Sequence, residues 1–327
     1  MENKTIDNKM LQKPWVVCSL AMLCCTLWGS AFPCIKIGYR LFHILPDAVG
    51  SQILFAGLRF TLAGILTVAM GSLASGRILL PVKTSIPKIF KLCMVQTVIQ
   101  YLFFYMGLAH ATGVKSAIIT GTNSLMAILI ASLIFRQEKL TIPKMTGCIL
   151  GFIGVALANM GGNGSTDLTF HLNGEGFIFI SAVSYAFSSV LIKRYSVNEN
   201  PVMLSGWQFT AGGVILMTVG LLMGGNIGTF TASAAAMLFY LALLSAVAYT
   251  LWSLLLKYNS VSRVTIFGFM NPVVGVLLSA LLLGEGGQAF SGKNILALLL
   301  VSAGIYVVNR FQNSGNVIHC KEPKVEN

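Results

Sequence analysis

The chain has 327 residues, of which only 10% are charged and 55% are hydrophobic, and its mean hydropathy is +0.79. Soluble domains carry about 25% charged residues, so this composition excludes a disordered chain, a coiled coil and an ordinary soluble enzyme. A formal net charge of +12 by itself suits a nucleic-acid-binding protein, but the basic residues stand between long apolar runs. The composition indicates a chain that lies mostly in a lipid bilayer.

Ten apolar runs approach the roughly 20 residues that a helix needs to cross about 30 Å of hydrocarbon. Lipid cannot satisfy the backbone of an open strand edge, so helix is the state expected for each run. In chain order the runs are Val16–Ile37, Ala48–Met70, Pro87–Leu108, Ser116–Phe135, Pro143–Met160, Gly176–Ile192, Val202–Met223, Ala232–Leu256, Val261–Leu283 and Phe290–Val308. We therefore predict an all-α integral membrane protein with ten transmembrane helices.

The distribution of Lys and Arg predicts how these helices are oriented. With the N-terminus placed inside, 17 of the 22 Lys and Arg residues fall in inner segments, four fall in outer segments, and Arg59 lies within a span. Cytoplasmic loops carry such an excess of positive charge. We expect a multi-pass protein of the cell membrane whose tails, residues 1–14 and 311–327, are both cytoplasmic, and we expect no nucleic-acid partner.

The two halves of the chain resemble each other at matched positions. Each half holds five predicted spans, an odd number, so the second half must enter the membrane from the side opposite to the first. We predict an inverted repeat, with halves at residues 15–160 and 176–310 joined by an outer linker at 161–175, an arrangement found in many secondary transporters. The matched pairs include Trp28 with Tyr185, Arg59 with Gln208, Tyr105 with Trp252 and Glu138 with Glu285.

Short motifs add a resemblance to a known family. Three segments are similar to motifs of EamA-type transporters, which belong to the drug/metabolite transporter superfamily. They are WGSAF from Trp28 to Phe32, NPVVG from Asn271 with the later LGE ending at Glu285, and GFIGVA from Gly151. The resemblance implies ten helices, a central pathway lined by the first four spans of each half, and movement of a small solute, commonly export of amino acids or other metabolites. The fourth span departs from the family pattern at Ser124, where Pro is frequent, which raises the question whether the halves bend alike.

Arg59 is the most informative single residue. At 1.5 Å per residue it lies roughly 9–16 Å into the second span, where an arginine costs about 2.5–3.5 kcal/mol on insertion scales. It should therefore face a cavity or a partner. Two interpretations stay open: its guanidinium binds an anionic group such as a solute carboxylate, or it pairs with backbone carbonyls or extends to the membrane surface.

Polar and aromatic side chains within the spans form the remaining candidate set. Amides in lipid need partners, and aromatic rings give a cavity apolar walls with polar tips. Helix packing and interfacial anchoring are the alternative interpretation of each one. The predicted solute pathway is Arg59, Trp28, Tyr101, Tyr105, Asn123, Tyr185, Gln208, Tyr249, Trp252 and Asn271, and Gln100 and Thr120 belong to the same wider set.

Three further expectations concern shape and partners. Pro272 lacks a backbone N–H and should kink the ninth helix, which makes it the predicted hinge. Gly147 and Gly151 permit a close helix approach, either in a homodimer or inside the bundle. His110 ends the third span, and either titrates near neutral pH or serves as an interfacial side chain.

The chemistry points away from catalysis. We find no CxxC pair, no compelling Ser/His/Asp arrangement and no carboxylate in the middle of a span, so we expect no metal, cofactor or catalytic residue. We predict a secondary transporter that moves a small-molecule solute across the membrane by alternating access around a central cavity. Its expected partners are that solute and the surrounding membrane lipid. The alternatives are a non-enzymatic membrane receptor or scaffold and, with less support, an intramembrane enzyme.

Overall fold

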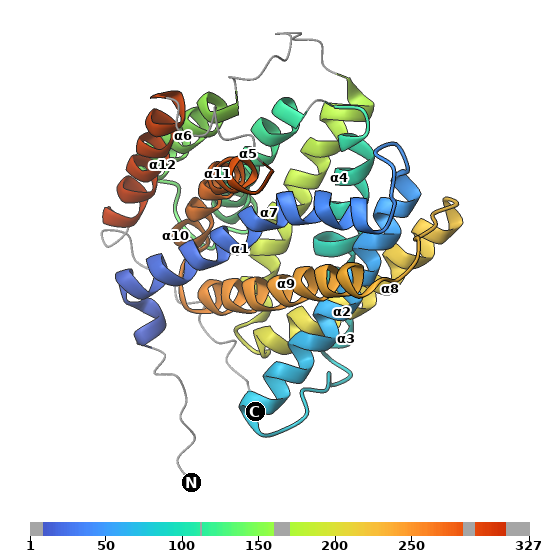
Figure 1. The fold of residues 1–327 in the computed structure, drawn as a ribbon. Helices are drawn as coiled ribbons and strands as arrows, with labels where there is room; N and C mark the ends of the chain where they lie inside the picture. The colour runs from blue at the N-terminus through green and yellow to red at the C-terminus, as the bar shows by residue number, and fades with distance from the viewer. Residues whose placement is uncertain (1–8, 112, 160–170, 284–291, 312–327) are drawn as a thin grey trace, which may run out of the picture.

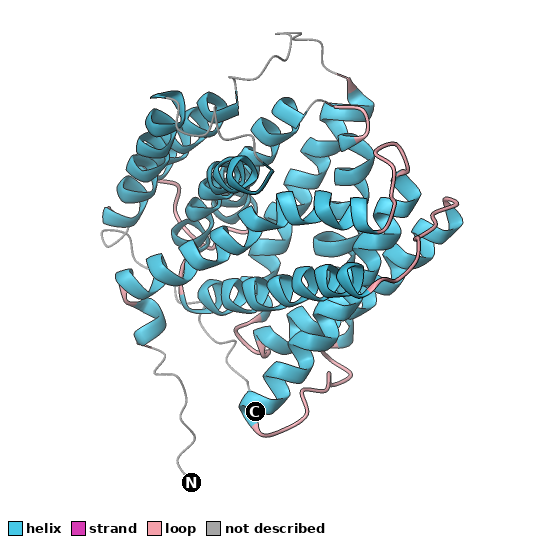
Figure 2. Cartoon of the chain, in the orientation of Figure 1, coloured by secondary structure: helices cyan, strands magenta, loops and turns pink. Residues whose placement is uncertain are grey.

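The computed structural model describes residues 9–111, 113–159, 171–283 and 292–311, and within these ranges the regular structure is entirely helical. Figures 1 and 2 show the helices packed side by side in one bundle. The helices are η1 (Met10–Gln12), α1 (Pro14–Leu41), α2 (Val49–Ser75), α3 (Ile86–Leu92), η2 (Cys93–Ile99), α4 (Gln100–Leu108), α5 (Gly113–Leu129), η3 (Ile130–Ile134), α6 (Ile142–Asn159), η4 (Leu172–Gly176), α7 (Phe177–Tyr195), α8 (Pro201–Leu222), α9 (Ala232–Tyr258), α10 (Val261–Thr265), η5 (Ile266–Phe269), α11 (Met270–Leu283) and α12 (Gly292–Arg310).

Helix covers the described part of every predicted apolar run except the end residues Ala48, Phe135 and Met223, which confirms the all-helical prediction for the rest of those residues. Six stretches of the described chain are long and apolar enough to cross a membrane: Pro14–Leu41, Val49–Ser75, Ile86–Leu108, Leu172–Tyr195, Pro201–Leu222 and Ala232–Tyr258. The other apolar helices are shorter. The ten-span, two-repeat topology therefore stays a prediction.

Some predicted boundaries differ from the structure or cannot be compared with it. The sixth helical stretch begins at Leu172, before the predicted Gly176, because a turn of π-helix (η4) precedes α7. Most of the predicted linker at 161–175 lies outside the described residues, as do Glu285, the start of the tenth predicted span and most of both predicted tails.

Helices α8, α9 and α10 begin where a side chain accepts a hydrogen bond from one of their first backbone N–H groups. The Asn200 side chain accepts hydrogen bonds from the backbone N of Val202 (2.8 Å) and Met203 (3.3 Å) ahead of α8, and Pro201 occupies the first helical position. Ser260 accepts similarly from Arg263 at the start of α10.

Glycines bring α2 and α8 into backbone contact. Gly57 and Gly64 on α2 face Gly206 and Gly213 on α8, at seven-residue intervals that keep them on one side of each helix. A Cβ added at Gly213 would lie 2.3 Å from the backbone N of Thr61. This pair of helices therefore lies alongside over most of its length (Figure 1).

The second close pair is α6 and α12. A Cβ at Gly147 would meet the Gly304 carbonyl oxygen at 2.7 Å, and one at Gly151 would meet the ring of Phe269 at 2.5 Å. Contacts within this chain thus occupy the glycine face for which a homodimer was one interpretation. The homodimer itself stays a prediction.

The ninth predicted run is irregular just before Pro272, which itself lies in the first turn of α11. The ninth run is α-helical in α10, tightens to a 3₁₀ turn in η5 and returns to α-helix in α11, and Pro272 cannot donate the backbone bond that would join the two parts regularly. The matched run of the first half passes Ser124 as regular α-helix in α5. The halves do not bend alike at this level, and the hinge role of Pro272 stays a prediction.

The bundle has two distinguishable ends. We call the end where α1 begins the basic end, because contacts of Lys88 with Glu199, of Lys144 with Glu138 and of Lys193 with the carbonyl of Leu256 tie its loops together. At the other end, which we call the opposite end, the backbone N of Gly228 donates to the Phe42 carbonyl at 3.2 Å.

A central cavity as the candidate functional site

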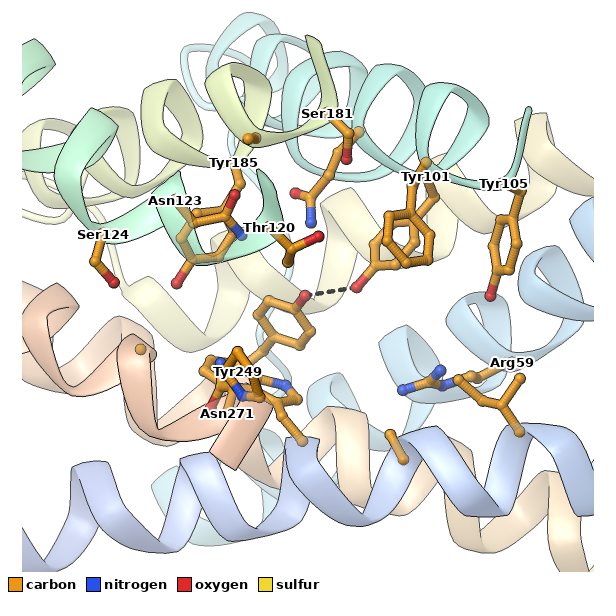
Figure 3. A pocket seen from close by; sticks show the side chains of 18 residues that line it. Arg59, Tyr101, Tyr105, Thr120, Asn123, Ser124, Ser181, Tyr185, Tyr249 and Asn271 are labelled. Carbon is orange, nitrogen blue, oxygen red and sulfur yellow. Dashed lines mark hydrogen bonds between the residues drawn. The ribbon is translucent and has the colours of Figure 1, made fainter. Parts of the chain in front are cut away.

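A cavity of about 150 Å³ lies among α1, α2, α4, α5, α7, α9 and the η5–α11 stretch (Figure 3). A cavity of about that size accepts a molecule such as benzene, so this conformation suits a small solute. The lining residues are Trp28, Ala31, Ile35, Arg59, Gln100, Tyr101, Phe104, Tyr105, Thr120, Asn123, Ser124, Ser181, Ala182, Tyr185, Tyr249, Gly268, Asn271 and Pro272.

The structure brings most of the predicted pathway residues to this cavity and leaves two outside it. Gln208 and Trp252 do not line it. Gln100 and Thr120, from the wider polar set, do. The predicted residues that line it are Arg59, Trp28, Tyr101, Tyr105, Asn123, Tyr185, Tyr249 and Asn271, together with the predicted hinge Pro272.

Arg59 enters the cavity from α2 with only 4% of its surface exposed. Its Nε donates to Ser245 Oγ at 3.0 Å and to the Leu241 carbonyl at 3.3 Å, both on α9. Figure 3 shows the end of the guanidinium pointing into the cavity. Among the described residues no carboxylate forms an ion pair with it. The Nε nitrogen is therefore bonded to α9, and the terminal nitrogens point into the cavity.

Aromatic rings from four helices form the walls beside Arg59. The Tyr101 and Tyr249 hydroxyls are hydrogen-bonded at 2.7 Å (Figure 3). The ring of Trp28 lies edge-on to Tyr249, with 5.0 Å between centroids, and the Tyr101 ring lies 4.3 Å from that of Phe60. Interlocked rings of this kind have few rotamers to exchange, so they present a defined apolar surface.

Several polar atoms in the lining have no partner in the protein. They are Trp28 Nε1, Gln100 Oε1, Asn123 Oδ1 and Asn271 Oδ1, and all four are buried. A buried polar atom without a hydrogen bond costs about 1–3 kcal/mol, so a partner is expected from outside the chain. Figure 3 shows Arg59 at one end of the cavity and Asn123 and Asn271 at the other. The cavity is thus positive at one end and rich in acceptor oxygens at the other.

The two predicted residues outside the cavity are buried near it. Gln208 is fully buried, its Oε1 accepts from Thr97 Oγ1 at 2.7 Å and its Nε2 donates to Gln96 Oε1 at 3.0 Å. Trp252 is 2% exposed and packs edge-on against Trp28 at 4.9 Å, and its Nε1 has no partner. Gln208 is thus bonded to η2, and Trp252 packs on α1.

Sequence reasoning overlooked the small lining residues. Ser181 lies one helical turn before Tyr185 on α7, so the shared face was a usable signal. Ser124 donates from α5 to the Thr265 carbonyl at 2.7 Å, a contact between the two halves that no local pattern encodes. His110 is exposed beyond α4 and does not line the cavity, which favours the interfacial interpretation.

An apolar cluster separates the cavity from the basic end. It includes Val17 and Ala21 of α1, Leu255 and Leu256 of α9, and Val264 of α10, each at most 1% exposed. Below it, Glu138 Oε1 accepts from the backbone N of Ser262 at 2.9 Å, and Oε2 accepts from Lys144 Nζ at 2.7 Å and from Ser262 Oγ. In this conformation the cavity is closed at the basic end.

The described part of the chain holds no group of three or more His, Cys, Asp or Glu side chains that could bind a metal ion. The lining is composed of amides, hydroxyls, aromatic rings and one guanidinium. These groups bind and orient a solute by hydrogen bonds and charge, which is the chemistry of recognition.

Comparison with known proteins places this geometry in context. A protein of Archaeoglobus fulgidus named as an uncharacterized transporter is 26% identical over 312 residues, which is 91% of this chain and 99% of that protein. The Escherichia coli inner membrane transporter YedA, also named as uncharacterized, is 27% identical over 86% of this chain and 89% of its own. A solved crystal structure shares the fold, with a TM-score of 0.73 at 18% identity, over 91% of this chain and 98% of that one.

The model of the EamA-like transporter family matches twice, at residues 15–160 and 172–310. Relatives named as transporters and the long apolar helices agree with that match. Because the two matches cover most of its length, the chain belongs to the EamA-like transporter family and is a multi-pass membrane transporter.

Proposed function

We propose that this transporter is a secondary carrier that exports a small metabolite, an amino acid or a related compound, by alternating access to the central cavity. The observation that carries the proposal is the polarity of the cavity, with the Arg59 guanidinium at one end and the unpartnered oxygens of Asn123 and Asn271 at the other.

This polarity suits a solute with both an acidic and an amino group. A carboxylate accepts charge-assisted hydrogen bonds from the terminal nitrogens of Arg59, which are about twice as strong as neutral ones. An ammonium group donates to the amide oxygens of Asn123, Asn271 and Gln100, which otherwise lack partners. The rings of Trp28 and Tyr249 cover the apolar part of the solute.

Two oppositely oriented halves are the architecture proposed for this movement. The packing supports it: α2 lies on α8 and α6 on α12, while α1 packs on α9 and α11 just as α7 packs on α4 and α5. The family model also matches each half separately. The charge bias predicts that the basic end and both termini lie on the cytoplasmic side of the cell (or inner) membrane. In that orientation this conformation is the outward-facing one.

The test is solute counterflow in reconstituted vesicles, with a panel of amino acids, nucleosides and polyamines. We expect exchange of amino acids and none of polyamines, which bring positive charge to Arg59. Arg59→Ala should lower the exchange by about tenfold or more, the equivalent of one charged hydrogen bond of about 1.5–3 kcal/mol. Arg40→Ala is the matched control, because Arg40 is exposed at the end of α1 and outside the cavity. Equal exchange by both variants, or no exchange by the wild type, would refute the proposal.

A further inference from the structure

The two predicted pathway residues that do not reach the cavity have a common property. In the internal repeat, Gln208 matches Arg59 and Trp252 matches Tyr105, and both of those counterparts line the cavity. By contrast, the matched pair Trp28 and Tyr185 lines it from both halves. Both halves therefore contribute matched residues to the centre of the cavity, whereas at the Arg59 end only the first-half member of each matched pair lines it.

The surroundings of the matched residues correspond. Arg59 is bonded through Nε to α9, at Ser245, and Gln208 is bonded to η2, at Thr97. In the repeat, η2 is the counterpart of that part of α9. The next residue on each helix, Phe60 and Phe209, stack on each other with centroids 5.3 Å apart and an angle of 12° between the rings. The two positions therefore flank one aromatic stack, each held by the equivalent helix of the other half.

The matched residues differ in the end of the bundle that they approach. Helix α2 starts at the opposite end, and Arg59 lies about 15 Å along it at 1.5 Å per residue. Helix α8 starts at the basic end, and Gln208 lies about 10 Å along it. Trp252 lies in the apolar cluster that closes the basic end. When that cluster separates, Gln208 and Trp252 are the matched residues positioned to meet an entering solute.

We propose that Gln208 and Trp252 form the acid-binding end of the site in the conformation open to the basic end, an inference that rests on the proposed carrier function. Trp252 Nε1, buried and without a partner here, donates to the solute carboxylate in that conformation, and Gln208 Nε2 leaves Gln96 to do the same. The solute's acidic group is then held by uncharged donors on the basic side and by a guanidinium on the other.

The first test is the accessibility of a cysteine at position 208. Gln208→Cys is treated with a membrane-impermeant thiol reagent from each side of sealed vesicles, and an N-terminal tag marks the basic side because α1 begins there. The labelling is measured above that of the unsubstituted protein, which has its own cysteines. We expect labelling from the basic side alone.

Leu216→Cys is the matched control. Leu216 lies two turns farther from the basic end on the same helix, is fully buried outside the apolar cluster of the basic end, and does not line the cavity. It should stay unlabelled from both sides. No labelling at position 208, labelling from the opposite side, or equal labelling of both positions would overturn the inference.

The second test keeps the fold and removes one donor. Trp252→Phe retains a six-membered aromatic ring and loses the indole N–H together with the five-membered ring that carries it. The concentration for half-maximal uptake from the basic side should rise about fivefold, the equivalent of one hydrogen bond. The probe is the amino acid that the wild type exchanges fastest, and uptake from the opposite side should change less than twofold. An unchanged value on the basic side, or equal changes on both sides, counts against the inference. Absence of wild-type counterflow would instead refute the carrier function.

Discussion

The role of a buried polar residue in this bundle depends on how many of its polar atoms are hydrogen-bonded within the protein. Arg59 is deeply buried, yet among the described residues only its Nε is hydrogen-bonded, while Gln208 at the matched position has both ends of its amide satisfied. An unsatisfied group is expensive in a dry environment. In this conformation the difference in bonding therefore distinguishes a residue available to a ligand from one held by the protein.

The Glu199 carboxylate offers a test of residue-level electrostatics outside the helices. Burial raises its pKa, but hydrogen bonds from Lys88 (2.7 Å) and Ser85 (2.8 Å) outweigh that effect and hold the pKa below its usual value. The folded protein thus binds this proton less readily than the unfolded chain. The pair stabilises the fold above a pH of about 4.3, and the gain is lost as pH falls through the lower folded pKa.

We therefore expect Glu199→Gln to lower the stability of the detergent-solubilised protein at pH 7. Exposed ion pairs typically contribute about 0.2–1 kcal/mol to the free energy of unfolding, and the loss should fall in the lower half of that range because the Lys88 side chain is 31% exposed. The difference from wild type should shrink as the pH falls below about 4.3 and vanish once the pH is below the lowered folded pKa, since both proteins are then uncharged at this position. Asp47→Asn, at an exposed residue without an ion pair, should show no such pH dependence. A difference that persists at low pH would assign the effect to packing.

Helix contacts depend on what the touching faces lack. The α2–α8 pair has glycines where two backbones meet, and a methyl group at Gly213 would lie 2.3 Å from a backbone nitrogen that cannot move independently. Overpacking of this kind costs about 1–3 kcal/mol. We expect Gly213→Ala to lower the unfolding temperature in detergent, while Gly292→Ala, with open space around its Cβ position, should leave it unchanged. Equal effects of both substitutions would show that helix propensity, and not contact, matters there.

The irregular η5 turn directly precedes the first turn of α11, where Pro272 has no backbone N–H to donate. Pro272→Ala restores that donor, so η5 can continue into α11 as regular α-helix. We expect the variant to be at least as stable as wild type and to exchange solute more slowly, because a regular helix resists the change in winding that a hinge needs. Wild-type counterflow rates in a stable Pro272→Ala protein would show that the proline contributes shape alone.

At the scale of the molecule, one buried ion cluster joins elements far apart in the chain. Glu138 lies in the connection before α6 and accepts hydrogen bonds at the first turn of α10 and from Lys144, with its own side chain 9% exposed. It thereby fastens the two halves to each other at the closed basic end. Loss of its charge weakens that closure, since Lys144 is left without its counter-ion.

We expect Glu138→Gln to shift the protein toward the conformation open to the basic end. Spin labels at the exposed Lys83 and Lys139 should report a longer and broader distance distribution in the variant. Glu199→Gln serves as the control, because that carboxylate also lies at the basic end but does not contact α10. Unaltered distances in Glu138→Gln would mean that the apolar cluster alone holds this end closed.

Local properties of the sequence determined the helical class, the approximate bounds of the spans and the residue types worth examining. An apolar run or an arginine within it, such as Arg59, acts through its own neighbours or through the solvent around it, so sequence alone reveals it. The family motifs are of the same kind, since they are short and continuous.

Only the tertiary structure decided which faces meet. Three findings depend on helices distant in the chain. Gln208 and Trp252 do not line the cavity, Arg59 is bonded to α9, and Gly147 and Gly151 are packed against α12 and η5. A one-residue rotation of a helix turns a side chain by about 100°, and hydrophobic runs that are apolar on every side do not specify that rotation. Close packing of glycine-bearing backbones and pairing of buried polar atoms supply what the runs leave undetermined.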